Sequence, residues 1–286
     1  MLYVSTGGFS NETAFETASG FIDANILSCE LSGGLFDKNI ESSLAKLKSR
    51  CSLQIHNYFP PPKKPFVMNL ASDDTDIINK TINHIKRGID ISSGLGINIY
   101  SFHAGYLLDP EINELGKKVK KKKLLDRTDG LNRFIDNVNS LGIYAKKMNT
   151  ILLIENNVLS NNNYKHFRMN PFLMVEEKEC AYVMQKTMDN VFLLVDLAHV
   201  KVSSASLGFD KIKFLESVDP WIRAYHLSDN DGLSDSNQPV RKDSWFWSYL
   251  KKDFDYCSLE VYGKSTLDLV EQLKLTKSKI KIISNN

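Results

Sequence analysis

Seven short apolar segments of this chain each end on a residue that can bind a metal ion or a sugar hydroxyl. These end residues are Glu30, His56, His103, Glu155, Asp196, His226 and Glu260. From His56 onward, neighbouring members lie 30 to 52 residues apart, which is the length of one strand, loop and helix. A closed (β/α)8 barrel brings the carboxyl ends of all its strands to one face. The repeated pattern therefore predicts that these residues meet there, in a metal-centred site.

The segments between these endings predict strands and helices that alternate along the whole chain. We expect strands over residues 2–5, 26–30, 53–56, 97–103, 151–155, 191–196, 222–226 and 257–261. The clearest helix starts after the capping residues at 72–75 and stops at the glycines 94 and 96. No dinucleotide-binding or P-loop glycine motif is present. We therefore expect one α/β domain over residues 1–286, a single (β/α)8 TIM barrel with a closed parallel sheet and outer helices.

Composition limits the partners of this chain. Lys and Arg total 36 against 34 Asp and Glu, so the net charge of +2 gives no general attraction to nucleic acid. The four cysteines show no Cys-x-x-Cys spacing, and we expect them to be reduced and buried, as in a cytosolic protein. The N-terminus lacks a secretory signal, and no window reaches the roughly 18 apolar residues of a membrane span. We expect a soluble, cytoplasmic protein without a membrane partner, and assembly into a homo-oligomer stays open.

Glu155, Asp196, His226 and Glu260 end the last four strands and form the predicted metal shell. Three carboxylates and one imidazole suit a divalent ion such as Mn²⁺, Mg²⁺ or Co²⁺. Such an ion can bind both oxygens of a hydroxy-ketone and stabilise an enediolate. Glu155 and Glu260 would then face each other across the substrate carbon as the catalytic acid/base pair.

Three further histidines extend this set. His199 follows Asp196 by three residues at the start of a loop, where a role toward substrate or a second metal and a structural role are equally supported. His56 and His103 add imidazoles from the third and fourth strands, and imidazoles favour zinc. The sequence therefore leaves room for a second metal beside the first.

Two loop segments near the same face each have two interpretations. The lysine-rich run over residues 117–123 is typical of a solvated helix face, because nearby acidic residues weaken the alternative of a phosphate anchor. The proline-rich loop after the third strand carries Tyr58 and Phe59. It fits an apolar lid over a sugar better than a wedge into DNA, because an enediolate must be kept from water.

Several short motifs together resemble the xylose isomerase-like TIM barrel superfamily. They are His56-Asn57-Tyr58-Phe59, Asn69-Leu70-Ala71-Ser72, Phe102-His103-Ala104-Gly105, Ile154-Glu155-Asn156-Asn157, Asp196-Leu197-Ala198-His199, His226-Leu227-Ser228-Asp229 and Leu259-Glu260-Val261-Tyr262. This superfamily contains sugar phosphate isomerases/epimerases and the AP endonuclease family 2, the endonuclease IV proteins. The resemblance covers nearly the whole chain and implies the barrel fold expected above.

The two branches imply different sites. In the epimerases, the counterparts of the four predicted shell residues hold one metal, and the two glutamates move the proton. In endonuclease IV, three zincs use these positions together with the counterparts of His56, His103 and His199. That branch also uses an Asp-x-His pair, which Asp235 and Asn237 match here with Asn in place of His. An alternative alignment with residues 243–245 again lacks the histidine, which puts a third zinc and phosphodiester cleavage in doubt.

We therefore expect a divalent-metal-dependent isomerase or epimerase of a small sugar or sugar phosphate, working through an enediolate held on the metal. The alternatives are an endonuclease IV-like zinc phosphodiesterase acting on abasic DNA, or a dehydratase on the same metal platform. A nucleic-acid partner is not expected. We assign to a second metal or to the substrate the residues His56, His103, His199 and Asp235. Substrate binding is assigned to Glu30, Asn156, Arg168 and Lys201.

Overall fold

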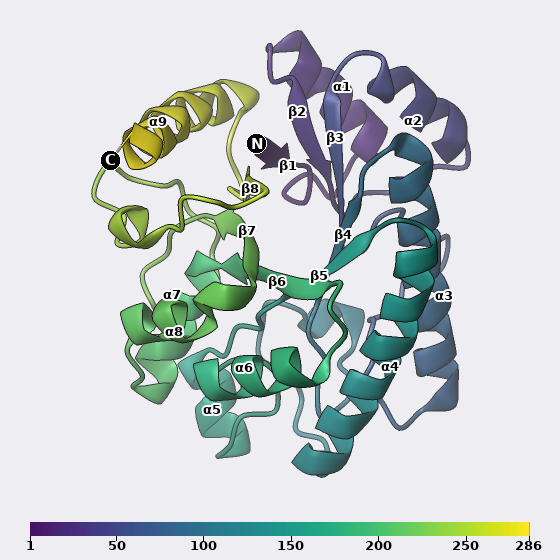
Figure 1. The fold of residues 1–286 in the computed structure, drawn as a ribbon, viewed down its shortest axis with the longest axis vertical. Coiled ribbons are helices and arrows are strands. Elements are labelled where there is room, and N and C mark those ends of the chain that lie inside the picture. Colours follow the sequence, from purple (N-terminus) through teal and green to yellow (C-terminus); the bar gives the residue numbers. More distant parts are fainter. Residues whose placement is uncertain (286) are drawn as a thin grey trace.

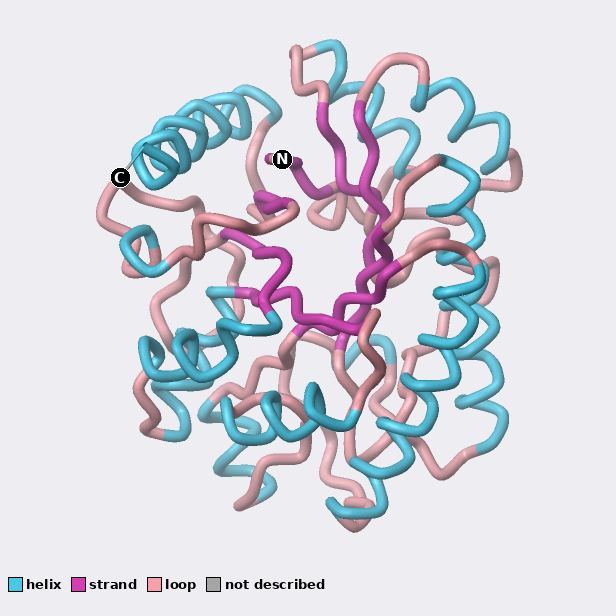
Figure 2. The backbone as a smooth tube through the Cα atoms, viewed as in Figure 1, coloured by secondary structure: helices cyan, strands magenta, loops and turns pink. Residues whose placement is uncertain are grey.

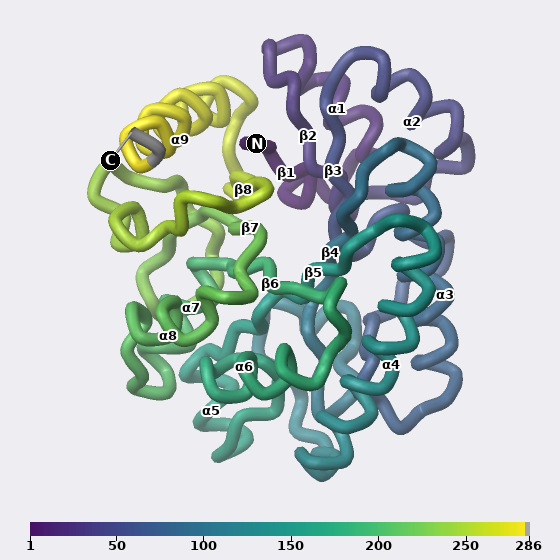
Figure 3. Tube along the Cα trace, viewed as in Figure 1, coloured from purple at the N-terminus to yellow at the C-terminus, as the bar shows by residue number. Residues whose placement is uncertain are grey.

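Eight parallel strands close into a barrel in the computed structural model, which describes residues 1–285 (Figure 1). Their bounds are β1 Leu2–Ser5, β2 Ser28–Leu31, β3 Ser52–His56, β4 Ile99–His103, β5 Ile151–Glu155, β6 Val191–Asp196, β7 Ile222–Leu227 and β8 Tyr256–Leu259. Each strand pairs with the next in the sequence, and β8 closes the barrel on β1. Figure 3 shows this closure, with the purple start of the chain beside the yellow strand near its end. The predicted (β/α)8 TIM barrel is confirmed.

Helices surround the barrel, as the cyan helices around the magenta strands of Figure 2 show. Their bounds are α1 Ala14–Asp23, α2 Ile40–Lys48, α3 Thr75–Leu95, α4 Arg127–Lys147, α5 Asn161–Phe167, α6 Glu177–Lys186, α7 Leu197–Leu207, α8 Lys211–Val218 and α9 Thr266–Asn285. Short 3-10 helices cover Ile112–Glu114, Asp219–Trp221 and Trp247–Tyr249. The caps expected for α3 are present. Asp74 accepts hydrogen bonds from two first-turn amides, and Gly96 ends the helix at a φ of 75°.

Alternation along the strands sorts their side chains into two environments. On β5, Leu152 and Ile154 face outward into the core shared with the helices, whereas Leu153 faces the interior of the barrel. An apolar layer of Tyr3, Leu153, Leu194, Ala224 and Tyr256 fills that interior. The predicted ligands lie on the same faces of their strands, two residues further along. Glu155 follows Leu153, Asp196 follows Leu194 and His226 follows Ala224. The period of two therefore places a polar layer directly above a packed apolar layer.

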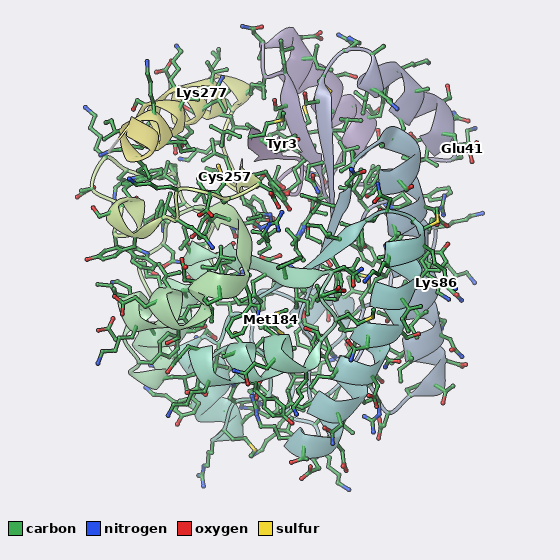
Figure 4. The ribbon with its side chains drawn as sticks, in the orientation of Figure 1. Tyr3, Glu41, Lys86, Met184, Cys257 and Lys277 are labelled. Carbon is green, nitrogen blue, oxygen red and sulfur yellow. The ribbon has the colours of Figure 1, made fainter. Side chains whose placement is uncertain are left out.

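Figure 4 labels side chains of the barrel strands and of the surrounding helices. Tyr3 of β1 and Cys257 of β8 lie near the centre of the molecule, and Glu41 of α2 and Lys277 of α9 lie at its edge. The four cysteines are free, as expected, but Cys51 is only half-buried, because it lies in the turn that precedes β3. Among the described residues, no helix combines the length and apolar character needed to cross a membrane.

The lysine run does not form a helix. Residues 117–126 have no regular secondary structure and form a loop that leads from β4 to α4. The loop after β3 contains the cis peptide Phe59–Pro60. Within it, Phe59 is buried in the core, whereas Tyr58 remains half-buried and its hydroxyl accepts a hydrogen bond from the Phe66 amide at 2.6 Å. The aromatic pair expected to act together is thus divided between the core and the mouth of the barrel.

Candidate metal centre

The structure brings Glu155, Asp196, His226 and Glu260 together at the carboxyl ends of β5 to β8. One ligand atom from each lies within 4.8 Å of the others, and all four side chains are buried. Glu260 lies one residue beyond β8, where its amide still donates to the Leu227 carbonyl. Backbone pairing therefore positions even the residue that lies outside its strand.

His226 is the centre of this group. Its Nδ1 atom lies 3.1 Å from Glu260 Oε2, 3.4 Å from Glu155 Oε1 and 4.0 Å from Asp196 Oδ2. On its other side, His226 Nε2 lies 3.1 Å from Glu30 Oε1. The Glu30 carboxylate holds the ring with Nδ1 turned toward the three other carboxylates, which is how a carboxylate behind a histidine ligand fixes the orientation of its ring.

The polar atoms of this group fit a divalent cation. Both carboxylate oxygens of Glu155, Oδ2 of Asp196 and Nδ1 of His226 are buried without a hydrogen-bond partner in the described part of the chain. Buried charge is costly unless a metal or another charge lies beside it. Here the imidazoles lie 3.2–4.0 Å from these carboxylate oxygens without hydrogen-bonding geometry, which leaves these atoms available to a cation. Oxygen-rich donors with one imidazole match the preferences of Mn²⁺, Mg²⁺ or Co²⁺, and zinc also accepts this set.

The ionisation of these groups reflects burial and mutual attraction. Burial raises the pKa of Asp196 to about 7, against the opposing effect of His199. Although burial acts to raise it, the neighbouring His226 lowers the pKa of Glu260 to about 2. Burial opposes protonation of His226, but Glu30, Glu155 and Glu260 raise its pKa well above 6.5. Without a cation, a proton on His226 thus compensates part of the negative charge.

A second group of potential ligands shares Glu155. Oε2 of Glu155 lies 3.2 Å from His56 Nε2 and 3.4 Å from His103 Nδ1, while its Oε1 faces His226. His56 is oriented from behind, because its Nδ1 is hydrogen-bonded to Ser101 Oγ at 2.9 Å. Glu155 therefore lies between two clusters, with one oxygen directed toward each.

His199 and Asp235 lie beside the first cluster. His199 Nδ1 is 2.7 Å from the Asn156 carbonyl, and its Nε2 is 3.2 Å from Asp235 Oδ2. Asp196 caps α7 by accepting a hydrogen bond from the His199 amide, which ties the two residues together. Asn237 has a φ of 42° and faces the same space.

The four residues assigned to substrate binding lie at different places. Glu30 is fully buried against His226, and the Asn156 side chain bonds to the backbone of Asp196. Lys201 is paired with Asp229, and Arg168 is exposed at the end of α5. Among the described residues, these four do not line the cavity above the cluster. Their role toward substrate stays a prediction.

A cavity of about 430 Å³ lies above the cluster. His103, His199 and Glu260 contribute to its floor, together with Asp235 and Tyr262. Part of its wall is aromatic or aliphatic and is formed by Tyr58, Phe66, Met68, Tyr106, Phe172 and Leu233, and lysine, asparagine and serine residues form another part. A cavity of this size with a polar floor and a partly apolar wall is typical of a small-molecule site.

Tyr262 is a site residue that the sequence did not single out. Its hydroxyl donates to Glu260 Oε1 at 2.6 Å, so Oε2 is left to face His226. The ring fits only because the turn after β1 has no side chains. A Cβ at Gly7 would lie 2.8 Å from the Tyr262 hydroxyl, and one at Gly8 would lie 2.8 Å from its ring. In the sequence, the Gly7-Gly8 pair after the first strand was the feature that could have indicated such a close approach of another side chain.

The chain belongs to the xylose isomerase-like TIM barrel family, whose model matches residues 21–270. A curated relative, a probable endonuclease 4 of Thermoplasma acidophilum, is 26% identical over 169 residues. That alignment spans 57% of this chain and 50% of the relative, so this chain matches about half the length of that protein.

Solved structures resemble the whole chain. A D-tagatose 3-epimerase-like protein has a TM-score of 0.73 at 17% identity and covers 99% of this chain and 98% of its own. The 3-keto-D-glucoside 4-epimerase of E. coli has a TM-score of 0.66 at 12% identity, with 97% and 98% covered. At these identities, the likeness concerns the fold alone.

Proposed function

We propose that this protein is a divalent-metal-dependent isomerase or epimerase of a small sugar. The observation that carries the proposal is the convergence of Glu155, Asp196, His226 and Glu260, with unpaired donor atoms, below a cavity of about 430 Å³. The epimerases among the structural neighbours support the same reaction class. A cavity of about 430 Å³ takes a small molecule better than a nucleic-acid duplex.

When bound, a divalent cation supplies Lewis acidity to a carbonyl and the adjacent hydroxyl of the sugar. The carboxylates of Glu155 and Glu260 then serve the proton transfer. One carboxylate takes the proton from the carbon next to the carbonyl. A proton then returns either to the opposite face of the same carbon or to the neighbouring carbon. Glu260 reaches the cavity and is steadied by Tyr262, whereas Glu155 is fully buried. The apolar part of the wall keeps water from the reacting carbon.

Solvent exchange tests the reaction class without knowledge of the particular sugar. The metal-loaded protein is incubated in D₂O with a panel of ketoses and their phosphate esters, and proton NMR follows deuterium at the carbons beside the carbonyl. Wild-type protein should incorporate deuterium into at least one sugar. Absence of deuterium exchange in every sugar of the panel would refute the proposal.

Substitution of Glu260 tests the acid/base assignment. Glu260→Gln keeps the size of the side chain but cannot accept the proton, so exchange should fall by about 10²–10⁴-fold. Because Glu260 is also a predicted metal ligand, exchange is measured at a metal concentration that keeps the variant loaded, and mass spectrometry verifies its metal content. Glu271→Gln is a matched control, because Glu271 is exposed on α9 and pairs only with Lys274 among the described residues. Full activity of Glu260→Gln would refute the assignment.

A second candidate, a zinc phosphodiesterase with two metals, is favoured by one observation. His56, His103 and Glu155 form a further ligand group that a one-metal isomerase does not require. The relative named a probable endonuclease 4 supports it as well. This candidate predicts two zincs per chain and cleavage of abasic DNA. His56→Ala should then reduce zinc from two to one and abolish cleavage, whereas an isomerase would retain solvent exchange.

A further inference from the structure

The loop over residues 116–123, here called the lysine loop, forms part of the cavity wall. Lys117 and Lys118 both line the cavity whose floor contains Glu260 and His199. Lys121 and Lys123 belong to the same loop and are exposed, but they do not line the cavity in the described part of the chain. Lys117 and Lys118 are exposed as well, so the two pairs differ only in whether they border the cavity.

Contacts on both sides of the two cavity lysines hold the loop in place. Asn163 donates from Nδ2 to the Lys117 carbonyl and accepts from the Val119 amide, each at 3.0 Å. Val119 is 3% exposed and packs in an apolar cluster with Phe167 and Phe172. The backbone that carries Lys117 and Lys118 is therefore fixed against α5 and needs little ordering when a ligand binds.

The acidic groups around the two lysines already have other partners. Among the described residues, no carboxylate lies within 4.0 Å of the ammonium groups of Lys117 and Lys118. Glu111 pairs with Lys120 at 2.8 Å. Of the three cavity-lining carboxylates, Glu114 accepts backbone amide hydrogen bonds and Asp235 faces His199. The third, Glu260, accepts from the Tyr262 hydroxyl.

Lys118 also lies close enough to His166 on α5 to affect its ionisation. Desolvation lowers the pKa of His166, and Lys118 and Lys121 lower it further. A cluster of uncompensated lysines beside a cavity attracts anions, and phosphate is the anion that lysine commonly binds as a point charge.

We propose that Lys117 and Lys118 bind a phosphate group of the ligand at the cavity mouth, while the opposite end of the ligand reaches the floor. The ligand would then be a phosphate ester, with its phosphate remote from the carbon that reacts. That the ester is a sugar rests on the proposed function, but the anion site itself does not. The cavity volume of about 430 Å³ leaves space for both parts.

Paired variants separate a specific anchor from general electrostatic attraction. Lys117→Ala/Lys118→Ala and Lys121→Ala/Lys123→Ala each remove two charges from the same loop. Calorimetry on the full-length, metal-loaded proteins measures binding of fructose 6-phosphate, fructose and inorganic phosphate. Circular dichroism and metal analysis check that fold and metal content are retained in both variants.

The proposal expects wild-type protein to bind fructose 6-phosphate at least tenfold more tightly than fructose. Lys117→Ala/Lys118→Ala should lose most of this preference, about tenfold, because hydrogen bonds to charged groups contribute on this scale. Lys121→Ala/Lys123→Ala should keep it. Inorganic phosphate that binds in a Lys117- and Lys118-dependent manner, while fructose 6-phosphate does not, would indicate a site for free phosphate and overturn the ester proposal.

Two other results would overturn the anchor. One is an equal loss of affinity in both double variants, which indicates long-range attraction only. The other is phosphate binding that is unchanged in Lys117→Ala/Lys118→Ala, which places the anion on the metal. Failure of the proposed isomerase activity is a separate outcome, because solvent exchange and anion binding are measured independently.

Discussion

Replacing Tyr262 with Phe removes one hydroxyl that touches a predicted metal ligand. This hydroxyl donates to Glu260 Oε1 at 2.6 Å, while Oε2 of the same carboxylate lies 3.1 Å from His226 Nδ1. The ring is held against Gly7 and Gly8, so the phenyl ring of the variant would keep the same place. The substitution therefore releases the Glu260 carboxylate without opening a large cavity.

The expected effect follows from the kind of hydrogen bond that is lost. A short O–H···O⁻ bond is charge-assisted, and a bond to a charged group contributes about 1.5–3 kcal/mol. Loss of a residue that orients a ligand typically lowers metal affinity by about 10–100-fold. Because Glu260 is 7% exposed at the cavity floor, water can replace part of the bond. We therefore expect metal affinity to fall by about tenfold, near the lower end of this range.

Competition with a chelating dye measures this change directly and needs no substrate. Tyr58→Phe is the matched control, because Tyr58 also lines the cavity but its hydroxyl is hydrogen-bonded to the Phe66 amide. Gly7→Ala should weaken metal binding in the same direction, since its Cβ displaces the Tyr262 hydroxyl. If folded Tyr262→Phe binds metal within about twofold of wild type, the reasoning is wrong.

Further outcomes follow from the same structure. Metal affinity should rise at least about tenfold from pH 6 to pH 8, since binding must displace a proton from Asp196, whose pKa burial raises to about 7, and one from His226, whose pKa, although burial opposes this, is raised by its carboxylate neighbours; a flat profile by dye competition would contradict this. A cation at about 100 times its dissociation constant should raise Tm by about 5 °C in calorimetry, and no shift would argue against a native-state site. Gly88→Ala should destabilise the protein by about 1–3 kcal/mol in urea unfolding, because its Cβ would lie 2.4 Å from Tyr100. Gly94→Ala in the same helix meets no atom within 4 Å and should instead stabilise by about 0.5–1 kcal/mol.

The fold was predictable because local signals agree along the chain. Apolar segments such as residues 151–155 and 191–196 became strands with the expected bounds. The capping residues before α3 and Gly96 after it marked both ends of that helix, although Gly94, also expected at its end, lies in its last turn. Once strands and helices alternate in this way, closure of the sheet brings the strand ends to one face. Glu155, Asp196 and His226 are together for that reason.

Other features depended on contacts between distant segments. The direction of each Glu155 oxygen follows from where β3, β4 and β7 place their histidines. Tyr262 became visible only when the turn after β1 was packed against it. The lysine loop has the composition of a solvated helix, but anchoring by Asn163 fixes it as cavity wall.

The sequence by itself determined the barrel and the chemical types at its mouth, because the period of two along each strand and the spacing between strands are local properties. Tertiary structure decided which oxygen faces which imidazole, which charges remain without a partner and how much space lies above them. These features depend on distances of a few ångströms between segments that are far apart in the chain, and only the packed structure sets those distances.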